Sequence, residues 1–210
     1  MSGPIRGSSL RAGLAALCML AAVVTTGAGT ASASPQAAST GTAVVTTQDA
    51  AGSSKLNISM QAQEQDQWCW AASGDTIATF LGHGTDQNSF CDLAYGQDTS
   101  YQCPNQPGQL SWVQNALSAL GVSPGQETGA LSFTTIVSEI NAGRPIETGI
   151  SWLAGGGHAQ VIYGYDQSNK SIYWGDPWPS SNRYNLASYS YYAGYNGQFN
   201  WNDSLYRIGA

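Results

Sequence analysis

Residues 63–72 read Gln-Glu-Gln-Asp-Gln-Trp-Cys-Trp-Ala-Ala and place a cysteine where a helix is expected to begin. Residues on one face of that helix recur at helical spacing in Ser73, Ile77, Phe80 and Leu81. We expect a helix over residues 68–81 that stops at Gly82, with Asp66 as its N-cap and Cys69 in its first turn. Because a helix N-terminus stabilises negative charge, a cysteine there is a candidate nucleophile.

The N-terminus resembles a secretory signal. Arg6 and Arg11 precede an uncharged apolar stretch over residues 12–24, and small residues follow up to Ala33. We expect cleavage after Ala33, which makes residues 1–33 the signal peptide and the mature protein secreted and extracellular. The apolar stretch is shorter than the roughly 18 to 20 residues that cross a bilayer, so no stable membrane anchor is expected.

The rest of the chain divides once by composition. Residues 34–54 are rich in Ala, Ser, Thr and Gly and predict a disordered linker or short pro-segment. Residues 55–210 have the size of one domain.

The charge of the mature chain disfavours some partners. Cleavage would remove two of the seven basic residues and none of the thirteen acidic ones, leaving five against thirteen. This acidity argues against binding to nucleic acid or to anionic membranes. We expect a monomer without a cofactor.

The cysteines indicate one disulfide and one free thiol. Cys18 would leave with the signal peptide, so the mature chain would keep an odd number of cysteines in an oxidising compartment. The polar residues 96–101 between Cys91 and Cys103 predict a loop that a disulfide would close. Cys69 is then the free thiol.

The remaining pattern indicates helices followed by strands. Two further helices are expected over residues 110–120 and, with Ser132 as cap, over residues 133–140. After Pro145 the apolar residues alternate, which predicts a strand over residues 146–152. A hairpin of residues 160–165 and 171–174 and a tyrosine-rich set of strands come next. The fold class is therefore α+β, with a cleft between two packed halves.

The chain has two histidines that could serve as a base. His83 lies at the far end of the Cys69 helix, about 20 Å from the thiol at 1.5 Å per residue, and is expected to be a C-terminal cap or an exposed loop residue. His158 precedes a strand and is the better candidate. If the hairpin turn pairs Tyr165 with Ser171, then Gln160 pairs with Asp176, and His158 lies one diagonal step away on the same face.

A shift of two residues in this register would put His158 directly opposite Asp176. In either register the carboxylate could orient the imidazole. The alternative for Asp176 is an ordinary turn residue before Pro177. Acyl transfer also needs donors for the developing oxyanion, such as the Cys69 backbone N–H and a side-chain amide. Four glutamines compete for that second role: Gln61, Gln63, Gln65 and Gln67.

Four segments carry a resemblance to a known family. They are Gln63 with residues 68–72, residues 143–146, residues 158–166 and residues 174–177. In these segments the chain resembles the papain-like cysteine peptidases, in particular the compact bacterial branch related to plant-pathogen type III effector proteases. It also resembles, more distantly, the double-glycine leader peptidases of bacteriocin exporters.

The resemblance implies a papain-like fold, with an N-terminal helical half that carries the nucleophile packed on a C-terminal antiparallel sheet. It implies a triad of Cys69, His158 and Asp176 and an oxyanion donor at Gln63. Papain itself has an asparagine as third member, and the long inhibitory pro-region of papain has no counterpart here. The implied reaction is peptide hydrolysis through a thioacyl intermediate.

Three other functions compete with this one. A transglutaminase-like or peptide-ligating enzyme would pass the same thioacyl group to an amine. A catalytically silent binding module would use the abundant tyrosines and tryptophans, with Cys69 as a buried small side chain. A zinc site is disfavoured because the cysteines and histidines lack short paired spacings, so no metal is expected.

Overall fold

The computed structural model describes residues 46–49, 52–194 and 197–210. The expected signal peptide over residues 1–33, and most of the expected linker over residues 34–54, lie outside this part of the chain. Within the described residues, no helix has both the length and the apolar character needed to cross a membrane.

The described residues form five helices and eight strands. The helices are α1 (Cys69–Phe80), α2 (Gln87–Ala94), α3 (Leu110–Ala119), α4 (Phe133–Asn141) and the short α5 (Tyr189–Tyr192). The strands are β1 (Thr46–Asp49), β2 (Ser53–Leu56), β3 (Gln126–Thr128), β4 (Ile146–Trp152), β5 (Gly157–Asp166), β6 (Ser171–Gly175), β7 (Tyr184–Ser188) and β8 (Phe199–Tyr206).

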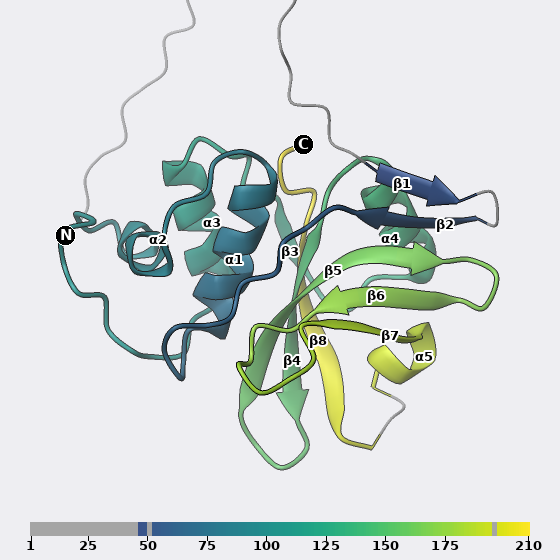
Figure 1. Cartoon of the computed structure of the whole chain (residues 1–210). Helices are drawn as coiled ribbons and strands as arrows, with labels where there is room; N and C mark the ends of the chain where they lie inside the picture. The colour runs from purple at the N-terminus through teal and green to yellow at the C-terminus, as the bar shows by residue number, and fades with distance from the viewer. Residues whose placement is uncertain (1–45, 50–51, 195–196) are drawn as a thin grey trace, which may run out of the picture. The chain divides into compact units, whose positions relative to one another are not determined.

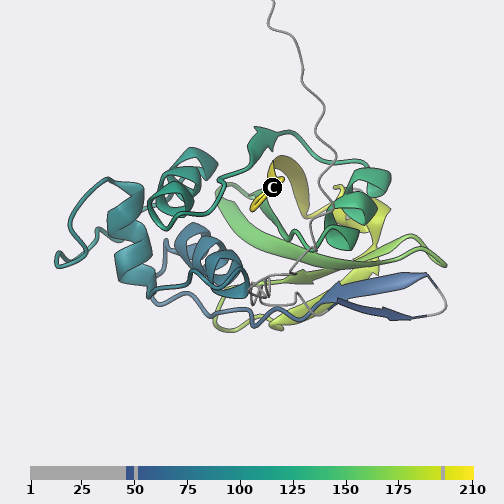
Figure 2. The same ribbon diagram turned by 90° about the horizontal axis from the view of Figure 1, so that it is seen from above.

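All strand pairs in the described residues are antiparallel and belong to one sheet. The order β1-β2-β5-β4-β8-β3 forms the main path, and β6 and β7 extend from β5. Figures 1 and 2 show α1, α2 and α3 grouped beside the sheet, with α4 and α5 next to strands at its other end. The α+β fold class predicted from the sequence is confirmed.

The N-cap residues of the helices confirm one prediction and contradict another. Ser132 caps α4 by accepting a hydrogen bond from the Thr135 N–H at 3.1 Å, as expected. The prediction for Asp66 was wrong: Trp68 is the N-cap residue of α1 and no side chain caps it. The sequence analysis missed α2, where Asp86 accepts a hydrogen bond from the Ser89 N–H at 2.8 Å.

The folded part of the chain begins earlier than the expected boundary between linker and domain at residue 55. β1 and the first residues of β2 lie inside residues 34–54, which the sequence analysis assigned to a disordered linker. β2 pairs with β5, with Ser54 opposite Tyr165, and Ser54 is buried. Composition misled because a strand that adds to an existing sheet gains its backbone hydrogen bonds from a neighbour and needs few large apolar residues.

The hairpin of β5 and β6 differs from the expected register at its turn. Asp166, and not Tyr165, pairs with Ser171. A β-bulge between Ile162 and Gly164 then shifts the pairing by one residue, so that Val161 faces Gly175. Continued by one residue, this pairing sets Gln160 against Asp176, which is the arrangement expected near the site.

The predicted disulfide is present between Cys91 in α2 and Cys103 in the following loop, 12 residues apart. Both cysteines are buried. Residues 98–102 between them form turn and loop structure, as expected.

We expect replacement of both Cys91 and Cys103 by alanine to lower the free energy of unfolding by about 2 to 3 kcal/mol, because the unfolded chain regains the entropy of an open loop. Urea denaturation followed by tryptophan fluorescence measures this difference. Cys69→Ala, which removes the free thiol, is the control. Equal midpoints for the double variant and the wild type would contradict the prediction.

Candidate active site

Cys69 is the first residue of α1 and is the free cysteine of the described residues. Its neighbours Trp68 and Trp70 are almost fully buried. The indole N–H of Trp68 donates to the Pro104 carbonyl at 3.0 Å, and that of Trp70 donates to the Gln106 carbonyl at 3.2 Å. The two tryptophans therefore fix the start of α1 to the loop after Cys103 and leave the thiol between them partly exposed.

This loop is shaped to approach Trp70 closely. A Cβ atom at Gly108 would lie 2.2 Å from the Trp70 ring, so only glycine fits there. The disulfide holds the beginning of the same loop at Cys103. The loop then lines one side of a cleft with Pro107 and Gly108.

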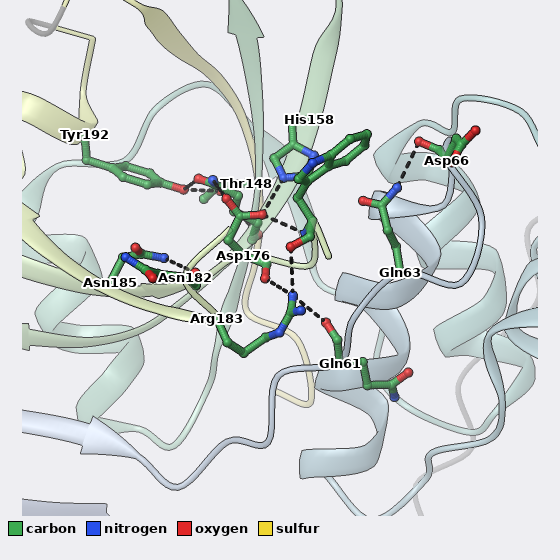
Figure 3. Close-up of polar contacts among 12 residues, drawn as sticks. Gln61, Gln63, Asp66, Thr148, His158, Asp176, Asn182, Arg183, Asn185 and Tyr192 are labelled. Atoms are coloured by element: carbon green, nitrogen blue, oxygen red, sulfur yellow. Dashed lines mark hydrogen bonds and ion pairs between the residues drawn. The ribbon is translucent and has the colours of Figure 1, made fainter. Parts of the chain in front are cut away.

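His158 and Asp176 form a buried ion pair. His158 lies near the start of β5 and Asp176 directly follows β6, and their Nε2 and Oδ1 atoms are 2.8 Å apart. The same Oδ1 accepts a hydrogen bond from the Trp178 backbone N–H at 2.9 Å, while Oδ2 accepts one from Gln160 Nε2 at 3.0 Å. Figure 3 shows the carboxylate turned toward the imidazole. The expected contact between these two side chains is therefore present.

Two tryptophans flank the imidazole. The Trp152 ring stacks on it with centroids 6.3 Å apart and 24° between the planes. The Trp178 ring meets it edge-on at the same separation and 81°. Because both rings pack on the imidazole, they shield the ion pair from water. Each indole is also partly exposed and lines the cleft.

These surroundings change the pKa of both members of the pair. Burial alone lowers the pKa of His158, but the interactions of its ring with Asp176 and Cys69 outweigh burial and raise it to about 9. Burial alone raises the pKa of Asp176, but hydrogen bonds from His158, Trp178 and Gln160 and the imidazolium charge hold it below its usual value. The structure therefore favours an imidazolium and a carboxylate at neutral pH.

A cleft of about 850 Å³ joins Cys69 to this pair. The helical half contributes Asp66, Gln67, Cys69, Trp70 and residues 107–110. The sheet contributes Glu127, residues 149–152, 157–159 and 203, and the turn between β4 and β5 contributes Gly155 and Gly156. The segment after β6 contributes Asp176, Trp178 and Ser181. A thiol at a helix N-terminus, an imidazole and an orienting carboxylate thus border one solvent-accessible space. This set of groups is suited to nucleophilic acyl transfer.

Comparison with known proteins agrees with this chemistry. The family model described as papain-like cysteine protease AvrRpt2 matches residues 52–194. The chain belongs to this family. It is accordingly a cysteine-type peptidase, and the resemblance seen in the sequence is confirmed.

No curated protein matches the chain. Among solved structures, the chain is similar to one from Bacillus anthracis described as a C39-like peptidase, with 14% identity and a TM-score of 0.48. That match covers 71% of this chain and 94% of the other.

The Gln63 side chain of this papain-like protease lies beside the site but is engaged elsewhere. Its Nε2 donates to the carbonyls of Gln65 at 2.8 Å and Asp66 at 2.9 Å. Its Oε1 is buried and has no hydrogen-bond partner within the described residues. Gln63 does not line the cleft that holds Cys69. Of the competing glutamines, Gln61 donates to Asp75 at 2.6 Å instead.

Arg183 connects the Asp176 segment to the segment between β2 and α1. Its guanidinium donates to the carbonyls of Asp176, Trp178 (3.4 Å) and Gln61 (3.5 Å), as Figure 3 shows for the contacts around Gln61 and Asp176. The Gln63 N–H adds a hydrogen bond to the Pro177 carbonyl at 2.8 Å. The segment with the carboxylate and the segment with the amide are therefore held together. The sequence analysis missed Arg183, because a contact to three carbonyls leaves no local motif.

Glu147 is another buried residue near the site that has no local sequence signal. It lies in β4, is fully buried, and neither carboxyl oxygen has a hydrogen-bond partner in the part of the chain described. Burial raises its pKa well above the ordinary value, and the charge of nearby Cys69 raises it further. A carboxyl that stays neutral avoids opposing a thiolate at Cys69.

His83, the other histidine of the chain, lies outside the site. His83 is exposed beyond α1, where its Nδ1 lies 2.9 Å from the Leu120 carbonyl, and it takes no part in the cleft. Within residues 46–49, 52–194 and 197–210, no group of three His, Cys, Asp or Glu side chains could hold a metal ion.

We predict that Asp176→Asn lowers the pKa of His158 from about 9, because the imidazolium loses its carboxylate partner while its burial persists. In the wild type, the stabilising contribution of this protonation is complete below the ordinary pKa of 6.5 and is lost as the pH rises through about 9. NMR titration of the ring protons measures the pKa, and His83→Gln assigns the second histidine signal. An unchanged titration of His158 in the variant would contradict the prediction.

We predict that Glu147→Gln stabilises the protein increasingly as the pH rises. The wild-type carboxyl titrates near 4.5 when unfolded but at higher pH when folded, so the wild type loses stability as the pH rises from 4.5 through the folded pKa. Urea unfolding at several pH values measures the difference between the two proteins. The exposed Glu127→Gln is the control. Parallel stability curves for the Glu147 variant and the wild type would show the prediction to be wrong.

Proposed function

We propose that this papain-like protease is a secreted cysteine peptidase in which Cys69 is the nucleophile, His158 the general acid and base, and Asp176 the residue that orients the imidazole. Gln63 and the Cys69 backbone N–H are the proposed oxyanion donors. The observation that carries the proposal is the shared cleft: the free thiol of Cys69 borders the same space as the buried His158–Asp176 pair.

The proposed reaction has two steps. In the first, the thiolate forms a bond to the peptide carbonyl carbon, the C–N bond breaks, and the imidazolium gives its proton to the leaving amine. In the second, the neutral imidazole takes a proton from water, whose oxygen attacks the thioacyl carbon. The C–S bond then breaks to release the carboxylic acid and the thiolate, and the imidazolium is restored.

The two proposed oxyanion donors differ in whether another acceptor already engages them. The first N–H groups of a helix have no acceptor within the helix, so no carbonyl of α1 accepts a hydrogen bond from the Cys69 N–H. Gln63 Nε2 would have to exchange the carbonyl of Gln65 or Asp66 for the oxyanion. An oxyanion carries a full charge and is a stronger acceptor than either carbonyl, but Gln63 does not line the Cys69 cleft, so its side chain would also have to turn toward Cys69.

Secretion rests on the N-terminal sequence and on the disulfide. Residues 1–33 have the charge and hydropathy pattern of a signal peptide, and the disulfide between Cys91 and Cys103 is stable in oxidising compartments. Intact mass of the protein recovered from the culture medium tests this part. A mature N-terminus at Ser34 supports it, and an intact N-terminus retained in the cells contradicts it.

The test of the catalytic assignment is alkylation of Cys69 with a low dose of iodoacetamide across pH, read by intact mass and peptide mapping. An ordinary thiol is only about 1% ionised at pH 6.5. We expect rapid and selective modification of Cys69 below pH 7. In His158→Ala the rate should be lower by about tenfold or more, because the thiolate, which is the reactive form, loses its imidazolium partner. His83→Ala is the matched control and should react like the wild type.

Active protein is then given a peptide library, and the products are identified by mass. Hydrolysed peptides support the peptidase, whereas transfer of the acyl group to an added amine would support the transglutaminase-like or ligating alternative. If Cys69 is no more reactive than a free thiol and no peptide is cleaved, the assignment fails and a binding module becomes the better hypothesis. If Cys69→Ala cleaves as well as the wild type, Cys69 is not the nucleophile.

A further inference from the structure

A chain of buried hydrogen bonds continues from Asp176 away from the cleft. Gln160 Nε2 donates to Asp176 Oδ2 at 3.0 Å, and Gln160 Oε1 accepts from the Tyr192 hydroxyl at 2.9 Å. The Tyr192 hydroxyl also lies 2.6 Å from Thr148 Oγ1. Gln160, Tyr192 and Thr148 come from β5, α5 and β4, and all three are buried. Figure 3 shows Tyr192 and Thr148 on the side of Asp176 that faces away from Gln63.

The protons available in this chain give it a direction. The two hydroxyls supply two protons, while three contacts compete for them, because Thr148 Oγ1 is also 3.2 Å from the Gln160 carbonyl. The two shorter contacts are satisfied if Thr148 donates to Tyr192 and Tyr192 donates to Gln160 Oε1. The Gln160 N–H then points to Asp176.

The Asp176 carboxylate can only accept, so the Gln160 NH₂ group faces it and the amide oxygen faces the Tyr192 hydroxyl. With the amide reversed, its oxygen would face a negatively charged Asp176 oxygen, and Tyr192 would have to donate to Thr148 in place of Gln160. The Tyr192 hydroxyl is therefore the group that holds the other end of the Gln160 amide. The position of the Tyr192 ring is fixed independently by packing on Trp174 and Trp201, with centroids 5.0 and 5.4 Å away.

We propose that Tyr192 is a positioning residue of the active site, which acts through Gln160 to hold the Asp176 carboxylate in the orientation that His158 requires. It has no contact with the cleft. This inference rests on the proposed function for its consequence in catalysis, but its structural part concerns the His158–Asp176 pair alone.

The test is Tyr192→Phe, which removes one oxygen and keeps the packed ring. We expect iodoacetamide to modify Cys69 about two- to tenfold more slowly at pH 6.5 than in the wild type, as the loss of one buried hydrogen bond implies. We also expect the NMR titration of His158 to move to lower pH. Thr148→Val should have a smaller effect, because Tyr192 can still donate to Gln160.

Tyr165→Phe is the matched control. Tyr165 is also buried, and its hydroxyl donates to Asn141 at 2.7 Å, away from the site. It should lose stability as Tyr192→Phe does but keep the wild-type alkylation rate and His158 titration. In an Asp176→Asn background, Tyr192→Phe should cause no further loss, because its effect passes through the carboxylate.

Two results would overturn the proposal. One is a Tyr192→Phe variant in which His158 titrates as in the wild type. The other is an equal fall in the Cys69 alkylation rate in Tyr192→Phe and Tyr165→Phe. An unreactive Cys69 in the wild type is a separate outcome. It would refute the proposed function, while the titration of His158 would still decide whether Tyr192 positions Asp176.

Discussion

The register of β5 and β6 is the constraint on which the site depends. Side chains alternate between the two faces of a strand, so His158 and Gln160 share one face and Val161 lies on the other. If the pairing of Asp166 with Ser171 continued without interruption, Asp176 would be opposite Val161. The bulge between Ile162 and Gly164 removes this one-residue error and brings the carboxylate to the face of the imidazole.

The neighbouring strand helps to define this bulge. β2 pairs with β5 at Gly164, where an added Cβ would lie 2.7 Å from the Ser54 carbonyl. Glycine therefore allows β2 to pack against the bulged strand. A segment that looks like a linker in the sequence thus contributes to the sheet that positions the site.

A second set of contacts positions the thiol. The loop after Cys103 receives hydrogen bonds from both indoles that flank Cys69 and passes against the Trp70 ring at Gly108. The disulfide ties this loop to α2. Because α1 begins without a side-chain cap, these tertiary contacts replace local capping in fixing where the helix starts.

The features of the fold that depend on a local sequence pattern were predicted correctly. Periodicity and stop signals found α1, α3, α4 and β4, and the polar loop between Cys91 and Cys103 identified the disulfide. The polar composition of α2 hid its helical face, and the bulge could not be seen because it depends on the neighbouring strand. The pairing of Gln160 with Asp176 was expected, but the roles of Tyr192 and Arg183 were missed, because Tyr192 contacts Gln160 and Arg183 contacts Gln61 across long stretches of sequence.

The buried polar groups around the site divide by whether their hydrogen bonds are complete. The carboxylate of Asp176 has partners on both oxygens and can remain charged although it is buried. Glu147 has the same functional group and deeper burial but no partner in the described residues, so its neutral form is favoured. Two carboxyl groups near one thiol therefore differ in charge: Asp176 stabilises the imidazolium, and neutral Glu147 leaves the negative charge of a thiolate unopposed. Hydrogen-bond partners therefore decide which of the two carboxyl groups stays charged and can take part in the chemistry.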